Sequence, residues 1–188
     1  MKKYTNLIIL LSILAVLIAG LGYMTYTSGR STKEDKKETI ASSKKSESLV
    51  NQRLPEFSMK TTSGEVVDSS KFSGKPMLIM EWASWCPYCQ KTLPVVNELY
   101  GKYKDDLQFV MLNALDGERE TAEKANKYVS EKKYDFTYYF DENLAAADKL
   151  KVETIPTLIF VDADGKVQKV GDSTLTQEEM EKTIQSLL

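Results

Sequence analysis

The chain has 188 residues, of which 42% are hydrophobic and 28% are charged, as in a globular protein with one folded domain and accessory segments. It has no histidine and only two cysteines, which excludes Ser-His-Asp and Cys-His catalysis, imidazole zinc sites and four-thiolate metal centres. Residues 49–188 carry 17 basic and 23 acidic side chains, so no large basic face is implied and no nucleic-acid partner is expected.

An apolar run over residues 7–26 follows two N-terminal lysines and contains no charged residue. About 20 residues at 1.5 Å per residue cover about 30 Å, enough to span a bilayer core. We therefore predict a cytoplasmic N-terminus over 1–6 and a transmembrane anchor over 7–26. Flanking lysines favour an inside N-terminus, which places the rest of the chain on the extracytoplasmic side of the cell membrane. A cleaved signal peptide is the alternative, but no Ala-x-Ala-like site follows Ala19.

Residues 27–48 have a different composition. Only Ile40 and Ala41 are appreciably apolar, so this stretch cannot bury enough surface to offset the entropy of ordering it. We predict a flexible extracytoplasmic linker. A basic patch that binds anionic lipid is the alternative, and it is less favoured because four acidic residues are interspersed with the lysines.

The remaining residues, 49–188, are predicted to form the folded domain. Five segments have the pattern of strands: 77–80, 107–112, 136–140, 157–161 and 166–170. The first of them is continuously apolar, as expected of a strand that is buried on both faces. Asp164-Gly165 separates the last two strands and predicts a hairpin.

Helices are predicted from about Pro87 through Tyr103, over 119–132, in a short segment that reaches Leu150, and after Thr176. Pro94 should kink the first helix. Asp141 can cap the short helix, and Thr176 with Glu179 forms a capping box for the last, whose inward residues would be Met180, Ile184, Leu187 and Leu188. Strands that alternate with helices, followed by a hairpin and a closing helix, predict an α/β fold with a mixed central sheet.

Both cysteines lie in one Cys-Pro-Tyr-Cys unit where the first strand meets the first helix. Cys86 would lie at the helix N-terminus, where free N–H groups and the macrodipole should lower its pKa below about 8.5. Cys89, almost one turn later, can close a disulfide with it, and Pro87 suits the first helical position. We predict thiol–disulfide exchange in which Cys86 is the exposed nucleophile and Cys89 resolves the mixed disulfide, with no cofactor or metal.

A purely structural disulfide is the alternative for this pair. A loop of only four residues would constrain the unfolded chain little, so the bond would make a poor staple. The redox interpretation is therefore favoured.

The segment Glu-Trp-Ala-Ser-Trp-Cys-Pro-Tyr-Cys, over 81–89, resembles the active-site segment of the thioredoxin superfamily. Leu-Pro-Glu-Phe over 54–57 and Phe-Ser-Gly-Lys-Pro over 72–76 resemble the TlpA/ResA-type extracytoplasmic thioredoxins, and Thr-Ile-Pro-Thr over 154–157 resembles their cis-proline loop. The resemblance covers about residues 50–188. It implies a thioredoxin-like three-layer fold, with helices on both faces of a mixed sheet.

The resemblance also implies where a substrate would bind. Pro156 should be cis and lie across from Cys86, where backbone edges could pair with a substrate strand. The residues implied in the active-site motif and substrate groove are Trp85, Pro87, Tyr88, Ile155 and Pro156. For Trp85, simple core packing is the alternative.

Two positions depart from that family. Thr92 stands where many of its reductases carry a glutamate, and Met80 stands where thioredoxin has a buried aspartate. Glu81 lies one position later, and adjacent strand positions point to opposite faces. It is either a buried proton shuttle with a raised pKa or a structural residue paired with a lysine.

The missing carboxylates and the predicted location, where disulfides persist, favour a disulfide-forming oxidase. The alternatives are a membrane-anchored reductase that supports apocytochrome c or a methionine sulfoxide reductase, and a non-catalytic binding module. The expected partners are substrate proteins with thiols or disulfides. A separate membrane or extracytoplasmic redox partner is also expected, because the chain has a single cysteine pair.

Overall fold

The computed structural model describes residues 45–188, so the predicted N-terminus, the anchor and most of the predicted linker lie outside the described residues. Within 45–188, no helix is both long enough and apolar enough to cross a membrane. The last four linker residues are described, and they contact the domain. Ser46 is buried and donates a hydrogen bond to the Lys151 carbonyl at 2.7 Å, and Lys45 pairs with Glu153. The folded domain therefore begins before Leu49.

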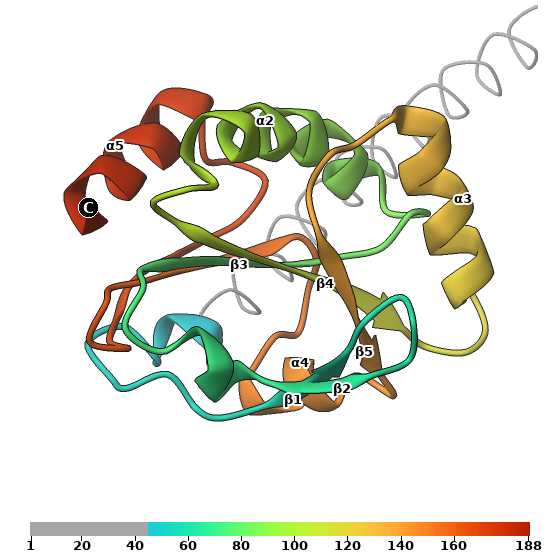
Figure 1. Cartoon of the computed structure of the whole chain (residues 1–188), viewed down its shortest axis with the longest axis horizontal. Helices are drawn as coiled ribbons and strands as arrows, with labels where there is room; N and C mark the ends of the chain where they lie inside the picture. Colours follow the sequence, from blue (N-terminus) through green and yellow to red (C-terminus); the bar gives the residue numbers. More distant parts are fainter. Residues whose placement is uncertain (1–44) are drawn as a thin grey trace, which may run out of the picture. The chain divides into compact units, whose positions relative to one another are not determined.

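Seven strands form one mixed sheet in the order β2-β1-β5-β4-β3-β6-β7 (Figure 1). Their bounds are β1 Ser58–Lys60, β2 Val66–Asp68, β3 Met77–Trp82, β4 Gln108–Leu115, β5 Tyr138–Glu142, β6 Thr157–Val161 and β7 Val167–Gly171. The pairs β3–β4 and β4–β5 are parallel, whereas β3–β6 and β6–β7 are antiparallel. The predicted α/β fold with a mixed sheet is confirmed.

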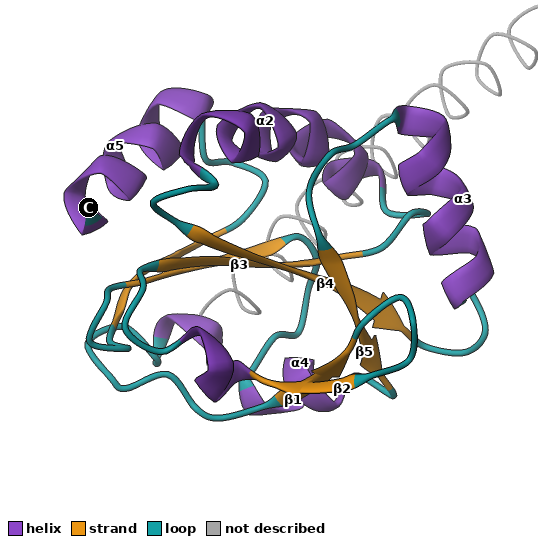
Figure 2. Ribbon diagram, in the orientation of Figure 1, coloured by secondary structure: helices purple, strands orange, loops and turns teal. Residues whose placement is uncertain are grey.

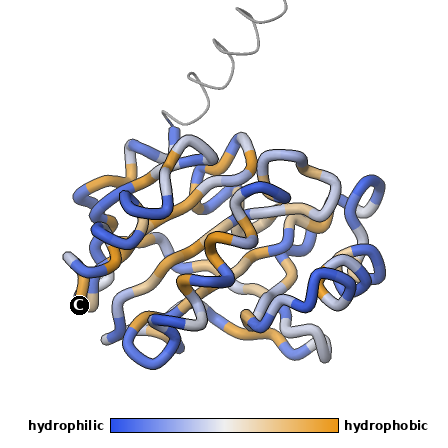
Figure 3. The backbone as a smooth tube through the Cα atoms, turned by 90° about the horizontal axis from the view of Figure 1, so that it is seen from above, coloured by the Kyte–Doolittle hydropathy of each residue, from blue (hydrophilic) through white to orange (hydrophobic). Residues whose placement is uncertain are grey.

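Helices cover both faces of this sheet. Their bounds are α2 Pro87–Tyr103, α3 Ala122–Lys132, α4 Ala145–Lys149 and α5 Gln177–Leu187, with a short 3-10 helix, η1, over Ser69–Phe72. The helices α2, α3 and α5 lie on one side of the sheet and α4 lies on the other (Figure 2). Hydrophobic residues concentrate along the segments that cross the middle of the domain, as the hydropathy colouring shows (Figure 3). This is the three-layer arrangement expected of the folded domain.

The central strand β3 is buried at all six of its residues, which confirms the strand predicted from its apolar run. Its alternate side chains enter two different clusters. Leu78 and Met80 join the cluster that also contains Cys86 and Cys89, whereas Ile79 packs in the cluster on the opposite face. The strand therefore separates two parts of the core, and its end points at the cysteine motif.

Side-chain caps fix the ends of two helices as predicted. The buried Asp141 carboxylate accepts hydrogen bonds from the N–H groups of Ala146 at 2.7 Å and Ala147 at 2.8 Å, in the first turn of α4. Thr176 and Glu179 form the capping box of α5. Each cap satisfies N–H groups that have no partner within the helix.

Several predicted bounds differ in the structure; β4, for example, spans Gln108–Leu115 rather than 107–112. Helix α3 begins at Ala122 rather than at 119, because Thr121 is its N-cap and accepts a hydrogen bond from the N–H of Lys124. Strand β5 begins at Tyr138 rather than at 136. Leu188 is 57% exposed although it was expected to face inward, because α5 ends one residue earlier and leaves it in solvent.

A matched pair of leucines tests the importance of the sheet core. Leu158 in β6 is fully buried, so we expect Leu158→Ala to destabilise the domain by about 2–5 kcal/mol through lost burial and a residual cavity. Leu188→Ala is the control, with an expected change within about 0.5 kcal/mol. Urea unfolding of both variants measures the difference, and equal effects would contradict the assigned core.

Candidate active site

The cysteine motif lies at the junction between β3 and α2. Strand β3 ends at Trp82, and α2 begins at Pro87 with Cys86 as its N-cap residue. The Cys86 sulfur accepts a hydrogen bond from the N–H of Cys89 at 3.2 Å. Pro87 has no N–H to satisfy, so the first helical position suits it. The predicted junction is confirmed.

The two thiols have opposite acid–base properties. The pKa of Cys86 is lowered to about 7, chiefly by the side-chain hydrogen bond with Cys89 and further by the backbone N–H groups of Cys89 and Tyr88, against an opposing effect of burial. The pKa of Cys89 is strongly raised, first by burial and then by its hydrogen bond to Cys86. At neutral pH the pair can therefore hold one thiolate, at Cys86, and one thiol, at Cys89.

The loop before β6 faces the cysteines. The Ile155–Pro156 peptide bond is cis, as the family resemblance implied. The Ile155 carbonyl oxygen lies 3.5 Å from the Cys86 sulfur and accepts its hydrogen bond. Two segments that are far apart in the sequence thus meet at the predicted nucleophile.

A pocket of about 390 Å³ opens beside Cys86. Its lining includes Trp85, Pro87, Tyr88 and Ile155 from the predicted groove. Trp85 is 36% exposed and Tyr88 is 59% exposed, so both aromatic rings lie at the rim and not in the core. Apolar residues from other segments also line the pocket, namely Ala114, Leu144, Ala147 and Val152, together with the charged residues Glu81, Asp116, Arg119 and Glu153.

Two predicted details of this groove differ in the structure. Cys86 is only 3% exposed, so it is less accessible than the exposed nucleophile we expected, and the pocket provides its access. Pro156 is buried and is not among the residues that line the pocket. Of the cis peptide unit, only Ile155 reaches the pocket.

Comparison with known proteins agrees with this geometry. The Redoxin family matches residues 49–188. The chain belongs to the Redoxin family. It is 29% identical to thiol-disulfide oxidoreductase ResA of Bacillus thuringiensis over 187 residues, which cover 100% of this chain and 99% of that relative.

Similar solved structures show the same fold. MTB dsbF, solved in its mixed oxidized and reduced forms, is 28% identical, has a TM-score of 0.62 and aligns over 70% of this chain and 95% of its own. StoA from Bacillus subtilis is 24% identical with a TM-score of 0.60, over 70% of this chain and 97% of its own. The chain is therefore a thioredoxin-like thiol–disulfide oxidoreductase, similar to the TlpA/ResA-type members.

The two departures from the family pattern are visible beside Cys89. Met80 is fully buried in the same cluster as both cysteines, where thioredoxin would place a carboxylate. The Thr92 hydroxyl donates a hydrogen bond to the Tyr88 carbonyl at 3.1 Å, within α2. Neither side chain supplies the carboxylate that those relatives place near the resolving cysteine.

Glu81 is the buried carboxyl group of this site. It is 1% exposed, lines the pocket beside Cys86, and neither of its oxygens has a hydrogen-bond partner among residues 45–188. Burial raises its pKa well above the ordinary value, and the nearby Asp141 carboxylate raises the pKa further. Across the described chain no lysine forms an ion pair with Glu81, so the lysine-paired alternative is wrong.

Sequence reasoning missed another buried acid near the cysteines, Glu120. Its carboxylate accepts hydrogen bonds from the backbone N–H and the hydroxyl of Ser84, two residues before Cys86. The preceding Arg119 places its guanidinium carbon 3.9 Å from the centre of the Trp85 ring. The only signal in the sequence is a polar stretch after a strand, which is typical of exposed loops.

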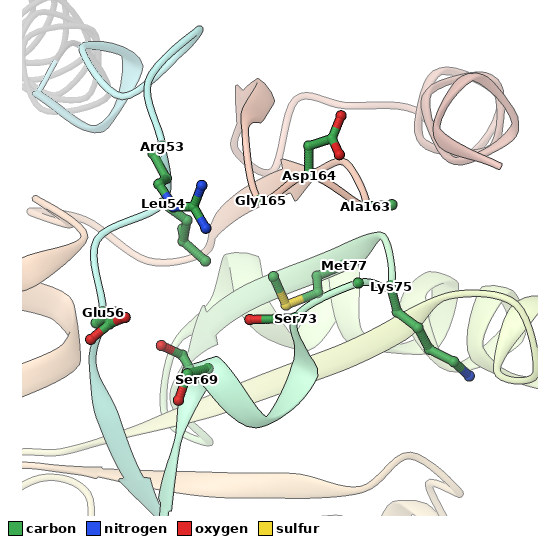
Figure 4. Close-up of a pocket in the computed structure, with 12 residues that line it drawn as sticks. Arg53, Leu54, Glu56, Ser69, Ser73, Lys75, Met77, Ala163, Asp164 and Gly165 are labelled. Carbon is green, nitrogen blue, oxygen red and sulfur yellow. The ribbon is translucent and has the colours of Figure 1, made fainter.

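A smaller pocket of about 150 Å³ lies elsewhere, and its lining includes Arg53, Ser69, Met77 and Asp164 (Figure 4). Met77 is the first residue of β3, whereas Cys86 follows the last. This pocket therefore lies at the opposite end of the strand and is separate from the cysteine site.

The difference between the two thiols can be measured by alkylation of the reduced protein. We expect Cys86 to react with iodoacetamide with a half-maximal rate near pH 7, while Cys89 stays unmodified because burial raises its pKa. In Cys89→Ala the half-maximum should move to higher pH, because the largest cause of the lowered pKa is lost. Mass spectrometry after short pulses measures both, and equal labelling of the two cysteines would contradict the assignment.

Proposed function

We propose that this oxidoreductase is a disulfide-forming oxidase, anchored to the cell membrane with its catalytic domain on the extracytoplasmic side. The carrying observation is that Met80 and Thr92 occupy the two positions near the cysteines where relatives of the reductase type carry a carboxylate, and that Met80 is fully buried in the cysteine cluster. The absence of a carboxylate removes the base that would activate Cys89 in a reductase.

The exchange runs in two steps on the Cys86–Cys89 disulfide. A client thiolate attacks the Cys86 sulfur, so a client–Cys86 disulfide forms, the internal disulfide breaks, and Cys89 leaves and takes up a proton. A second client thiol loses its proton and attacks the mixed disulfide, so the client gains a disulfide and Cys86 leaves as a thiolate. The client is oxidised by two electrons and the cysteine pair is reduced.

Client proteins would bind along the groove beside Cys86. The Ile155 backbone next to the sulfur offers an edge for an extended client segment, in the manner of strand addition. The rim presents Trp85, Tyr88 and Leu144 as exposed apolar surface, so we infer that clients place apolar side chains next to their reactive cysteine.

The location and the partner rest on the sequence. The apolar run over 7–26 and the polar linker that follows support an anchored, extracytoplasmic domain. The chain has one cysteine pair, so a separate membrane or extracytoplasmic protein must accept the two electrons and restore the disulfide.

Glu81 is the proposed proton shuttle of the pocket. Its buried, unpartnered carboxyl group opens on the space beside Cys86, where client thiols lose protons and leaving thiolates gain them. The other ionisable groups that face it are Asp141 in β5 and, along the pocket, Cys86, Tyr88, Asp116, Arg119 and Glu153. A buried polar group without a partner costs stability, so its presence favours a functional role.

The direction of electron flow can be read in intact cells. We expect Cys86 and Cys89 to be found mostly as a disulfide when free thiols are trapped by rapid acid quenching and alkylation, because an oxidase rests oxidised. The purified disulfide form should also oxidise a dithiol peptide stoichiometrically, and Cys86→Ser should not. A mostly reduced pair in cells would contradict the proposal and support the reductase alternative.

Replacing Glu81 should separate stability from activity. We expect Glu81→Gln to raise the free energy of unfolding, measured with urea near pH 8, by about 1–3 kcal/mol relative to the wild type. The folded pKa is raised, so the wild type loses stability as the pH rises from the unfolded value of about 4.3 through the folded pKa, and the gap should close at low pH.

The same variant should exchange disulfides more slowly, with a flatter dependence of rate on pH. Glu65→Gln, at an exposed position of the β1–β2 turn, is the control and should change neither property. Unaltered rates in Glu81→Gln across the pH range would remove Glu81 from the proposed mechanism.

A further inference from the structure

The loop between β4 and α3, residues 116–120, holds a carboxylate that is fully buried without a countercharge. Glu120 is 0% exposed and forms no ion pair with any residue of 45–188. Its oxygens accept three hydrogen bonds instead: from the Ser84 N–H at 2.9 Å, from the Ser84 hydroxyl at 2.7 Å and from the Asn113 amide at 2.8 Å. Burying a carboxylate is costly, and two of the three bonds that offset the cost reach one residue of the active-site loop.

The 116–120 loop is itself fixed before it reaches Ser84. The Asp116 carboxylate accepts hydrogen bonds from the N–H groups of Glu118 at 3.0 Å and Glu120 at 2.8 Å. These bonds lower the pKa of Asp116, with the Glu120 N–H as the largest cause, so the carboxylate stays ionised. The Lys124 ammonium donates to the carbonyls of Glu118 and Arg119 from the other side. These hydrogen bonds fix the backbone of the 116–120 loop, from which the Glu120 side chain extends to Ser84.

Consecutive residues of this loop contact consecutive residues before Cys86. Glu120 binds Ser84, and Arg119 lies over the ring of Trp85 at 3.9 Å while its Nε donates to Asp116 at 3.3 Å. A cation over the face of a tryptophan is attractive and orients the ring. The two contacts hold both the backbone and the exposed side chain of the segment that leads into Cys86.

The same segment is held from the helix as well. The Gln90 side chain in α2 donates to the Ser84 carbonyl at 2.8 Å, and Asn113 reaches the Trp82 carbonyl at 3.4 Å. The Cys86 N–H in turn donates to the Ala83 carbonyl at 3.3 Å. If Ser84 moved, the path of the chain into Cys86 would change, and with it the contact between the Cys86 sulfur and the N–H of Cys89.

We propose that Arg119 and Glu120 are positioning residues for thiol–disulfide exchange: they fix Trp85 and Cys86 in the orientation from which the Cys86 sulfur reacts. No bond to either residue changes during the reaction. The inference rests on exchange at Cys86, which the proposed function shares, and it does not depend on whether clients are oxidised or reduced.

The test compares Glu120→Ala and Ser84→Ala with Glu118→Ala as the matched control. Glu118 belongs to the same loop, but its side chain is exposed. The first readout is the rate constant for reduced protein with an aromatic disulfide reagent, measured above the pKa of Cys86 so that every variant reacts as thiolate. The second is iodide quenching of tryptophan fluorescence. Trp82 is fully buried and Trp85 is 36% exposed, so quenching reports on Trp85.

We expect Glu120→Ala to lower the rate constant about tenfold or more and to increase quenching, because the loop loses its anchor. Ser84→Ala should do the same to a smaller degree, and the double variant should be no slower than Glu120→Ala, because both changes remove one shared contact. Glu118→Ala should match the wild type.

A purely structural role predicts a different result. Lower thermal stability with wild-type rate constant and wild-type quenching in Glu120→Ala would overturn the proposal. If Glu120→Ala fails to fold, Ser84→Ala decides, because it removes one hydroxyl and no backbone group, and wild-type values there overturn the proposal equally. If the wild type exchanges with the reagent but does not oxidise a dithiol peptide, only the proposed oxidase direction fails.

Discussion

The contact of Cys89 with the Cys86 sulfur, through its thiol first and its N–H second, is the interaction on which the rest of the site depends. It exists because α2 begins directly after Cys86, where the first turn of a helix has N–H groups without partners. Pro87 contributes no N–H of its own, so it adds no unsatisfied donor to that turn. The position of this first helical turn is fixed by β3, which is buried along its whole length. A buried strand thus places Cys89 where its hydrogen bonds stabilise the Cys86 thiolate.

The same burial makes the two sulfurs unequal. Cys89 lies in the first turn of α2 and in the same apolar cluster as Met80, so burial disfavours its thiolate more than the nearby backbone hydrogen bonds favour it. Cys86 borders the pocket, and its charge is met by hydrogen bonds. The alternation of β3 then places Glu81 on the face away from that cluster. The nucleophile and the buried acid both border the pocket, but the core of the sheet separates the acid from the resolving thiol.

Much of this fold could be predicted because its signals are local. The residues 157–161 form a strand with the predicted bounds, since a short apolar run between polar turns has few alternatives. The capping box of α5 needs only Thr176 and Glu179 at the right spacing. The strand–helix junction at the cysteine motif could be predicted in the same way, because a proline and two cysteines at that spacing suit the start of a helix.

The missed features have different physical causes. The short strands of the β1–β2 hairpin contain three residues each, too few for a periodic pattern. The start of α3 was placed too early because the Asp116 hydrogen bonds hold 116–120 in a non-helical path. Glu120 could not be recognised as a buried residue, since its burial comes from Ser84 and Asn113, which only the folded sheet brings to it.

The contact between the first described residues and the 151–153 segment has a mechanical consequence. Ser46 bonds to the Lys151 carbonyl, and Lys45 pairs with Glu153, which borders the active-site pocket two residues before Ile155. A shift of residues 45–46 would therefore move the 151–153 segment and, through Glu153, the wall of the pocket. The first described residues and the entrance to the cysteines are thus mechanically coupled.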